Sequence, residues 1–142
     1  MIHYWDTSAL IPCFLNEEAT GKVREWLQSE GDTPRFTSWL TAFEFETVLK
    51  RKLQQKQITL REYQSIQEQW VDFQKALNLI PLDERVSRLG LRIQKIHGLW
   101  TCDSIQLGCA SLLQVEYSKM KFVCLDRKLT HAATQEGFDC LA

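Results

Sequence analysis

An acidic residue ends the first β-prone run of this chain and begins the first helical one. The run Ile2–Trp5 contains no glycine or proline, which favours a buried strand, and the residues after Asp6 are typical of a helix start. Asp6 is therefore expected at the carboxyl end of a strand and at the N-terminus of a helix. Ligands bind at this edge of open α/β sheets, so Asp6 either caps the helix or holds a metal ion.

The rest of the chain alternates between strand-like and helix-like segments. Strands separated by helices indicate a parallel sheet that is covered on both faces, so the predicted fold class is α/β. Further strands are expected at 35–38, 78–82, 121–125 and 138–141. Helices are expected at 7–15, 18–30, 40–55, 59–76, 83–97, 103–115 and 127–136.

Length and composition are those of a globular protein with one domain, 1–142. Hydrophobic residues make up 44% and charged residues 25% of the chain, and no linker or repeat interrupts it. No stretch approaches the ~18 apolar residues of a membrane span, and no basic leader precedes an apolar run. The five cysteines form no Cys-x-x-Cys pair, which argues against a zinc site and indicates reduced thiols. We expect a cytosolic protein.

Two more aspartates stand where helices are expected to begin. Asp126 follows the apolar run 122–125 and repeats the strand, acid and helix pattern of Asp6. Two parallel strands would bring these two carboxylates to one edge of the sheet. Asp103 opens a helix that is apolar nearly all round and so is expected to be central; it also fits a helix cap with a polar residue three positions later.

Glu44 and Glu46 compete for a fourth position in this group of acids. Glu44 has Leu40 and Val48 four residues away on either side, so it lies on or beside the buried stripe of its helix. Glu46 has Lys50 four residues later, which is the favourable order for a surface ion pair. A carboxylate that faces inward must be paired, protonated or bound to a metal, and we therefore favour Glu44.

Four carboxylates at one edge of the sheet would repel one another unless a cation lay between them. A hard divalent ion such as Mg²⁺ or Mn²⁺ prefers oxygen ligands, and the chain offers no cluster of His and Cys that would select zinc. The predicted ligands are Asp6, Glu44, Asp103 and Asp126.

The net charge is −1, but basic residues are concentrated in two acid-free stretches, 50–61 and 85–102. In the second stretch Arg85, Arg88 and Arg92 recur at helical spacing and form one stripe of a helix. The stripe is either a solvated helix face or a surface that contacts RNA phosphates, and the sequence favours neither interpretation.

Four blocks of sequence, one around each of the four acids, resemble the signature blocks of PIN-domain nucleases. The resemblance is closest to the VapC-like toxins of toxin-antitoxin systems, and the order and spacing of the blocks match over nearly the whole chain. The blocks are WDTSAL at 5–10, TSWLTAFE at 37–44, HGLWTCDSIQL at 97–107 and FVCLDRKL at 122–129.

The resemblance implies a three-layer α/β/α sandwich with a mostly parallel five-stranded sheet. It implies RNA cleavage that depends on one or two Mg²⁺ or Mn²⁺ ions, with Ser8 as a polar neighbour of the acids. It also implies a homodimer and a cognate antitoxin whose tail covers the acidic site. Two departures stand out: Trp100 occupies a position where Arg or Lys is frequent, and Arg127 and Lys128 follow the fourth acid where some relatives have another acid.

Two other functions remain open at this stage. A PIN-like fold without catalysis would serve as a protein-interaction module, with its basic stripes on an acidic partner. A phosphatase that used Asp6 as nucleophile is disfavoured, because the second acid often found two residues later is replaced by Ser8.

Overall fold

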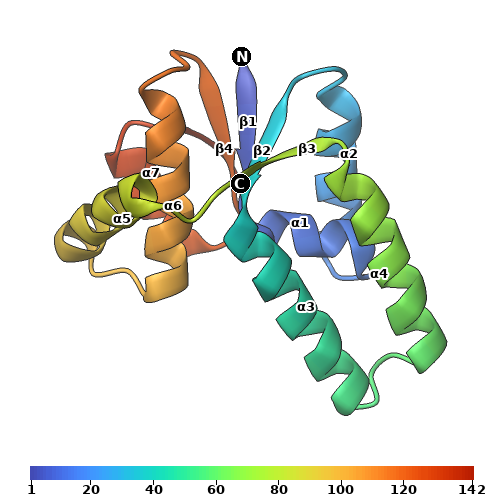
Figure 1. Ribbon diagram of the computed structural model, residues 1–142. Helices are drawn as coiled ribbons and strands as arrows, with labels where there is room; N and C mark the ends of the chain where they lie inside the picture. Colours follow the sequence, from blue (N-terminus) through green and yellow to red (C-terminus); the bar gives the residue numbers. More distant parts are fainter.

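A computed structural model describes residues 1–142 as a sheet of five strands between two layers of helices (Figure 1). The strands are β1 (Ile2–Trp5), β2 (Arg35–Ser38), β3 (Leu77–Ile80), β4 (Met120–Val123) and β5 (Asp139–Leu141). The helices are α1 (Thr7–Phe14), α2 (Thr20–Ser29), α3 (Trp39–Gln54), α4 (Leu60–Gln74), α5 (Glu84–His97), α6 (Thr101–Gln114) and α7 (Arg127–Gln135).

The sheet order is β3-β2-β1-β4-β5, and all four strand pairs are parallel. The chain leaves β1 for β2 and β3 on one side and later returns to β4 and β5 on the other. The order therefore reverses between β1 and β4, where Trp5 is paired with Val123. In a doubly wound sheet the crevice at such a reversal is where ligands bind, and Asp6 directly follows β1 at that point.

The two faces of the sheet carry separate hydrophobic clusters. Side chains alternate along β1, so that Tyr4 packs beneath α5, α6 and α7 whereas Trp5 packs beneath α1, α2, α3 and α4. Figure 1 shows the corresponding division of the helices on either side of the strands. The prediction of a three-layer α/β/α sandwich is confirmed, and the sheet is parallel throughout.

Helices α5 and α6 pack unusually closely through two glycines. A Cβ added to Gly108 would lie 2.9 Å from the backbone nitrogen of Gly90 and 3.0 Å from the carbonyl oxygen of Val86. Any side chain at Gly108 would therefore push the two backbones apart. This contact holds α6 in the centre of its layer, with its first turn at the carboxyl edge of the sheet.

The predicted start of α6 at Asp103 is wrong. The helix begins at Thr101, and the N-cap is Trp100, which has an extended backbone and no side-chain capping bond. Asp103 is the third helical residue and does not cap the helix. The sequence pattern indicates Asp103 as the cap because neither Trp100 nor the preceding Leu99 has a side-chain carboxylate or hydroxyl. The left-handed Gly98 (φ 64°) ends α5, as expected.

Two strands begin and end earlier than their apolar runs predict. β3 ends at Ile80 rather than at position 82, and β4 ends at Val123 rather than at position 125. The apolar residues Cys124 and Leu125 lead from β4 to Asp126, and only one backbone hydrogen bond, from Cys124 N–H to the Leu141 carbonyl at 3.0 Å, continues the pairing there.

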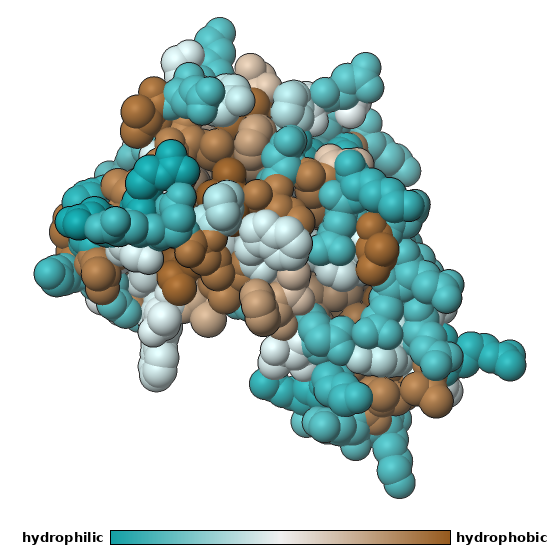
Figure 2. Space-filling view, in the orientation of Figure 1, coloured by the Kyte–Doolittle hydropathy of each residue, from teal (hydrophilic) through white to brown (hydrophobic).

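Helices α3 and α4 form an antiparallel pair that extends beyond the carboxyl edge of the sheet (Figure 1). The far end of this pair is covered mainly by hydrophilic side chains, at the lower right of Figure 2. A capping box fixes the start of α4: Glu62 N–H donates to the Thr59 hydroxyl, and Thr59 N–H donates to the Glu62 carboxylate. None of the helices has the length and apolarity that crossing a membrane requires.

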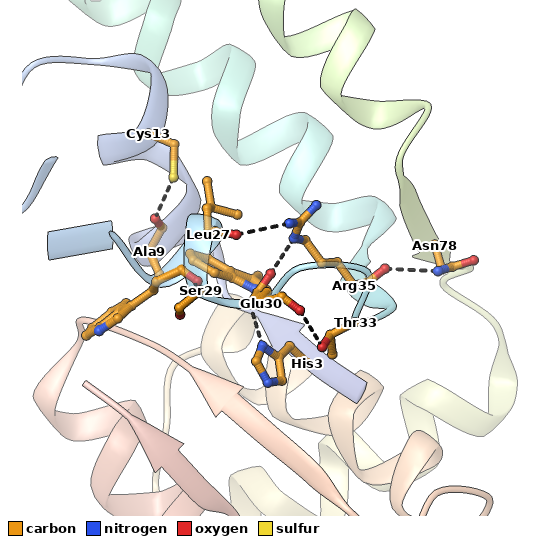
Figure 3. Close-up of polar contacts among 11 residues, drawn as sticks. His3, Ala9, Cys13, Leu27, Ser29, Glu30, Thr33, Arg35 and Asn78 are labelled. Carbon is orange, nitrogen blue, oxygen red and sulfur yellow. Dashed lines mark hydrogen bonds and ion pairs between the residues drawn. The ribbon is translucent and has the colours of Figure 1, made fainter. Parts of the chain in front are cut away.

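A buried acid, Glu30, ties the end of α2 to the first two strands (Figure 3). Its carboxylate contacts His3 Nδ1 and accepts hydrogen bonds from Trp5 Nε1 at 2.6 Å and from Arg35 Nε. The Glu30 side chain is 1% exposed, and Arg35 supplies a compensating positive charge. This cluster links β1 and β2 to the end of α2 and so helps to fix the strand that Asp6 directly follows.

Candidate functional site

A cleft of about 480 Å³ opens at the carboxyl edge of the sheet, and all four predicted acids line it. They come from four places in the chain: the start of α1, the middle of α3, the first turn of α6 and the residue before α7. The other side chains that line the cleft are Thr7, Ser8, Ile11, Leu40, Phe43, Thr47, Val48, Arg51 and Cys102.

Asp6 both caps α1 and faces this cleft. Its backbone is extended, and its carboxylate accepts hydrogen bonds from Ser8 N–H at 3.1 Å and from the Ser8 hydroxyl at 2.6 Å. The pKa of Asp6 is raised to about 6: burial is the largest cause, the hydrogen bonds from Ser8 oppose the rise, and the negative charges of Glu44 and Asp103 add to it. The two interpretations of Asp6 as cap and as cleft acid are therefore compatible.

Ser8 connects the two loops that carry Asp6 and Asp126. While its hydroxyl donates to Asp6, the same oxygen accepts a hydrogen bond from Leu125 N–H at 3.0 Å. The turn after β4 is thereby held against the start of α1. Ser8 thus positions two of the four acids relative to each other.

Glu44 points into the cleft, and buried polar residues orient its carboxylate. One oxygen accepts hydrogen bonds from the Thr7 hydroxyl and from Gln106 Nε2, both at 2.8 Å. Gln106 is 1% exposed, and its own carbonyl accepts a hydrogen bond from Tyr4 OH at 2.6 Å. Gln106 is not among the predicted site residues; the one available signal is an amide between the apolar residues Ile105 and Leu107 of α6.

Glu46 lies on a different face of α3. Its carboxylate accepts hydrogen bonds from Tyr63 OH and, at 3.1 Å, from Gln67 Nε2, both on α4. The ion pair expected with Lys50 is not formed, and Lys50 Nζ lies instead 5.5 Å from the ring centre of Tyr63. Glu44 therefore faces the cleft and Glu46 faces away from it, as predicted from their positions on the helix. The predicted ion pair between Glu46 and Lys50 is wrong.

Asp103 and Asp126 complete the acidic lining. Burial raises the pKa of Asp103, the neighbouring charges of Asp126 and Glu44 raise it further, and Lys128 lowers it. Asp126 caps α7, with one carboxylate oxygen accepting a hydrogen bond from Leu129 N–H at 2.8 Å. The pKa values of Asp6 and Asp103 are thus raised first by burial and then by the negative charges of neighbouring acids in the same cleft.

The chemistry of these side chains fits a hard divalent cation, since all four offer carboxylate oxygens and no imidazole lies among the acids. Two thiols lie nearby: Cys102 lines the cleft, and the Cys124 sulfur lies 3.7 Å from Asp6 Oδ2. As they lie, no three His, Cys, Asp or Glu side chains in the chain are grouped closely enough to form a ligand set. The Asp6 carboxylate is turned toward Ser8, and that of Glu44 toward Thr7 and Gln106.

Arg85, Arg88 and Arg92 do not line the cleft. Each lies beside an acid: Arg85 bonds Asp83 at 2.8 Å, Arg88 bonds Glu84 at 2.5 Å, and Arg92 bonds Glu136. The basic residue that does line the cleft is Arg51 on α3, which belongs to the first acid-free stretch and forms no ion pair.

A family model of the PIN domain matches residues 4–135, which is nearly the whole chain. The chain belongs to the PIN-domain family. The cleft acids of this PIN domain all lie within the matched region. No curated protein sequence matches the chain.

Several solved structures share the fold of this PIN domain. The crystal structure of FitAcB from Neisseria gonorrhoeae matches with a TM-score of 0.74 and 16% identity, covering 99% of this chain and 97% of that one. VapBC2 from Rickettsia felis, bound to a DNA fragment from its promoter, gives 0.71 and 11%, covering 99% and 98%. A toxin-antitoxin complex from Klebsiella pneumoniae gives 0.69 and 16%, covering 99% and 96%. At these identities the likeness establishes the fold alone.

Proposed function

We propose that this PIN domain, working as a single domain 1–142, is a metal-dependent endoribonuclease and the toxin of a toxin-antitoxin pair. PIN domains are generally nucleases. The observation that carries the proposal is the set of four carboxylates, delivered by four separate elements to one cleft in a chain of this family. A structural neighbour described as a toxin-antitoxin complex supports the toxin assignment.

Asp6, Glu44, Asp103 and Asp126 would hold one or two Mg²⁺ or Mn²⁺ ions. When bound, such ions activate a water for attack on a phosphodiester and neutralise the charge of the leaving oxygen. The chain itself supplies orientation. Ser8 holds the Asp6 carboxylate, and Thr7 with Gln106 holds that of Glu44.

A cognate antitoxin, a homodimer and an RNA substrate belong to the same proposal. The neighbouring structure from Klebsiella pneumoniae is a toxin-antitoxin complex, and VapBC2 from Rickettsia felis is bound to a DNA fragment from its promoter; both share the fold of this chain. A small DNA-binding protein encoded beside this chain would support the antitoxin, and sedimentation of the purified chain would measure its oligomeric state.

A non-catalytic interaction module is the second candidate. It is favoured by one observation: the carboxylates of Asp6 and Glu44 are already hydrogen-bonded by Ser8, Thr7 and Gln106. A module would keep these bonds for stability alone and would need no ion.

The deciding experiment is cleavage of an internally labelled RNA in Mg²⁺, in Mn²⁺ and in chelator. We expect internal cleavage by the wild-type chain only when a divalent ion is present, and at least roughly 100-fold slower cleavage by Asp103→Asn. Asp32→Asn, an exposed acid outside the cleft, is the matched control and should cut at the wild-type rate. Inertness of the wild type in both ions would favour the module, and release of phosphate from a small ester without RNA cleavage would favour a phosphatase.

A further inference from the structure

The two acid-free basic stretches of the sequence end up in different electrostatic surroundings. On α5, each of Arg85, Arg88 and Arg92 has a carboxylate within hydrogen-bond distance, from Asp83, Glu84 and Glu136. Asp83 and Glu84 directly precede the acid-free stretch 85–102, and Glu136 follows α7, so none of the three acids lies within the stretch itself. Their negative charges largely cancel the positive electrostatic potential of the three arginines.

The first stretch, at the far end of α3 and the start of α4, lacks such compensation. None of its five basic residues forms an ion pair; they are Lys50, Arg51, Lys52, Lys56 and Arg61. The nearest acid on α4, Glu62, has its carboxylate on the backbone of Thr59 in the capping box. This end of the α3–α4 pair is thus a region of uncompensated positive charge.

A second hollow, of about 580 Å³, lies in this region and follows the acidic cleft along α1 and α3. Ile11 and Arg51 line the cleft, and Phe14 and Lys52 line the second hollow. Arg61 and Glu62 of α4 also line it, together with the amides of Asn16, Gln57 and Gln69. Cations and amide donors therefore continue from the wall of the cleft toward the α3–α4 turn.

One large aromatic side chain stands on the same helix beside the acids. Phe43 lines the cleft next to Glu44, yet 67% of its surface is exposed. It lies eight residues before Arg51, or about 12 Å along the helix axis, which three to four stacked nucleotides span at ~3.4 Å each. An exposed aromatic face beside a row of cations is the combination that binds unpaired nucleic acid, because bases stack while cations hold phosphates.

We infer that α3 and the start of α4 form the binding track for an unpaired RNA strand. A base stacks on Phe43, and Arg51, Lys52 and Arg61 bind phosphates on the side of the cleft that leads to the α3–α4 turn. This inference rests on the proposed function for the identity of the ligand. It assigns the phosphate contacts to the first basic stretch and not to the α5 stripe.

The test compares two triple variants that remove the same number of charges. One is Arg51→Gln with Lys52→Gln and Arg61→Gln, and the other is Arg85→Gln with Arg88→Gln and Arg92→Gln. Binding of a fluorescent unpaired RNA oligonucleotide is measured in chelator, over a series of salt concentrations. Because both variants have the same net charge, only the location of the lost charge distinguishes them.

For the α3–α4 variant we expect binding at least tenfold weaker and a salt slope reduced by about two, at ~0.7 per contact on a single strand. The α5 variant should bind within about twofold of the wild type. Phe43→Leu should weaken binding of the unpaired oligonucleotide by roughly tenfold while leaving the salt slope unchanged. Circular dichroism of each variant checks folding; the single variant Arg51→Gln replaces the α3–α4 triple if that does not fold, and Arg88→Gln replaces the α5 triple.

Each contrary outcome identifies which proposal fails. If the wild type cuts RNA but the α3–α4 variant binds as tightly as the wild type, the track is wrong and the proposed function stands. If the wild type binds through these residues but never cuts, the proposed function fails and the track stands. Equal weakening by both variants, or a change in oligomeric state without a change in RNA binding, would also overturn the track.

Discussion

Asp6 and Glu30 are both buried acids, 4% and 7% exposed, and the chain treats them in opposite ways. Glu30 contacts His3, Trp5 and Arg35, so its negative charge has a cation and two further polar partners. Asp6 accepts hydrogen bonds only from the neutral groups of Ser8 and, at 3.7 Å, from the Cys124 thiol, and it feels the like charges of Glu44 and Asp103. The first carboxylate is neutralised by the protein, and the second is not.

This difference supports a structural role for Glu30 and the proposed functional role for Asp6, although the two acids are linked through adjacent residues at the end of β1. Trp5 donates to Glu30, and the next residue is Asp6. A carboxylate that is paired with a fixed cation contributes to holding strands and helices together. A carboxylate that is buried beside other carboxylates has an unfavourable electrostatic free energy when ionised, and binding of a cation would lower that free energy.

The largest expected effect is on stability, from Glu30→Gln. Removing the carboxylate charge leaves the Arg35 guanidinium largely buried without its partner, which typically costs about 3 to 5 kcal/mol. Urea unfolding in chelator at pH 7 measures the loss. Asp32→Asn, a nearby exposed acid, should change stability by less than about 0.5 kcal/mol. A loss below about 1 kcal/mol for Glu30→Gln would mean that this cluster does not hold α2 to the sheet.

Asp6→Asn should act in the opposite direction in chelator. Asn caps helices about as well as Asp, and the variant no longer carries a buried negative charge. The rise of the Asp6 pKa from its usual 3.8 to about 6 corresponds to roughly 3 kcal/mol of unfavourable free energy at neutral pH, so the variant gains up to that amount.

The sign of this effect fixes its pH window. Because the folded pKa is raised, the wild type has full stability from Asp6 below about pH 4 and loses it as the pH rises through about 6. The gain of Asp6→Asn should therefore be small at pH 4 and largest above pH 7. Unfolding of both proteins at the two pH values measures it, and a variant less stable than the wild type at pH 8 would show that the buried charge of Asp6 does not destabilise the fold.

The sequence predicts these two acids with unequal success, for a physical reason. Asp6 and Asp126 each follow an apolar run and precede a helix, so local pattern alone places both at the carboxyl edge. Glu30 shows no such pattern, because its partners His3 and Trp5 lie 27 and 25 residues away. Contacts of this kind depend on how α2 docks, which no local periodicity encodes.

The same dependence on long-range contacts explains why the sequence does not predict the ion pairs and positions of the basic residues. Helical spacing correctly groups Arg85, Arg88 and Arg92 on α5, but Glu136 reaches Arg92 from the end of α7, 44 residues later. Arg51 was visible as part of a basic stretch, whereas its position in the cleft depends on the tilt of α3 against α1. Fold class and the acidic positions follow from the sequence, and charge compensation does not.

Mg²⁺ should distinguish the two acids through stability as well as activity. At about a hundred times its dissociation constant, a bound ion adds roughly 2.7 kcal/mol to the wild type. Asp6→Asn should largely lose this gain together with RNA cleavage, whereas Glu30→Gln, though less stable, should keep the gain because its cleft is intact. Thermal unfolding in chelator and in millimolar Mg²⁺ measures both. Equal gains in the two variants would show that Asp6 is a helix cap and not a ligand.

The smallest effect is expected at Glu46, an exposed acid on the same helix as Glu44. A Gln at position 46 keeps an oxygen that accepts from Tyr63 OH, so Glu46→Gln should change stability by no more than about 0.5 kcal/mol and cleavage by less than about twofold. The pKa of Tyr63, which the hydrogen bond to Glu46 raises, should fall toward its usual value of 10, and ultraviolet titration of the phenol detects that change. Glu44→Gln should instead reduce cleavage strongly, because Thr7 and Gln106 hold that carboxylate in the cleft.

The comparison of the two variants tests which face of α3 each glutamate occupies. Equal loss of cleavage in both would contradict the assignment of Glu44 to the cleft and of Glu46 to the face that contacts α4, because the two acids would then act alike.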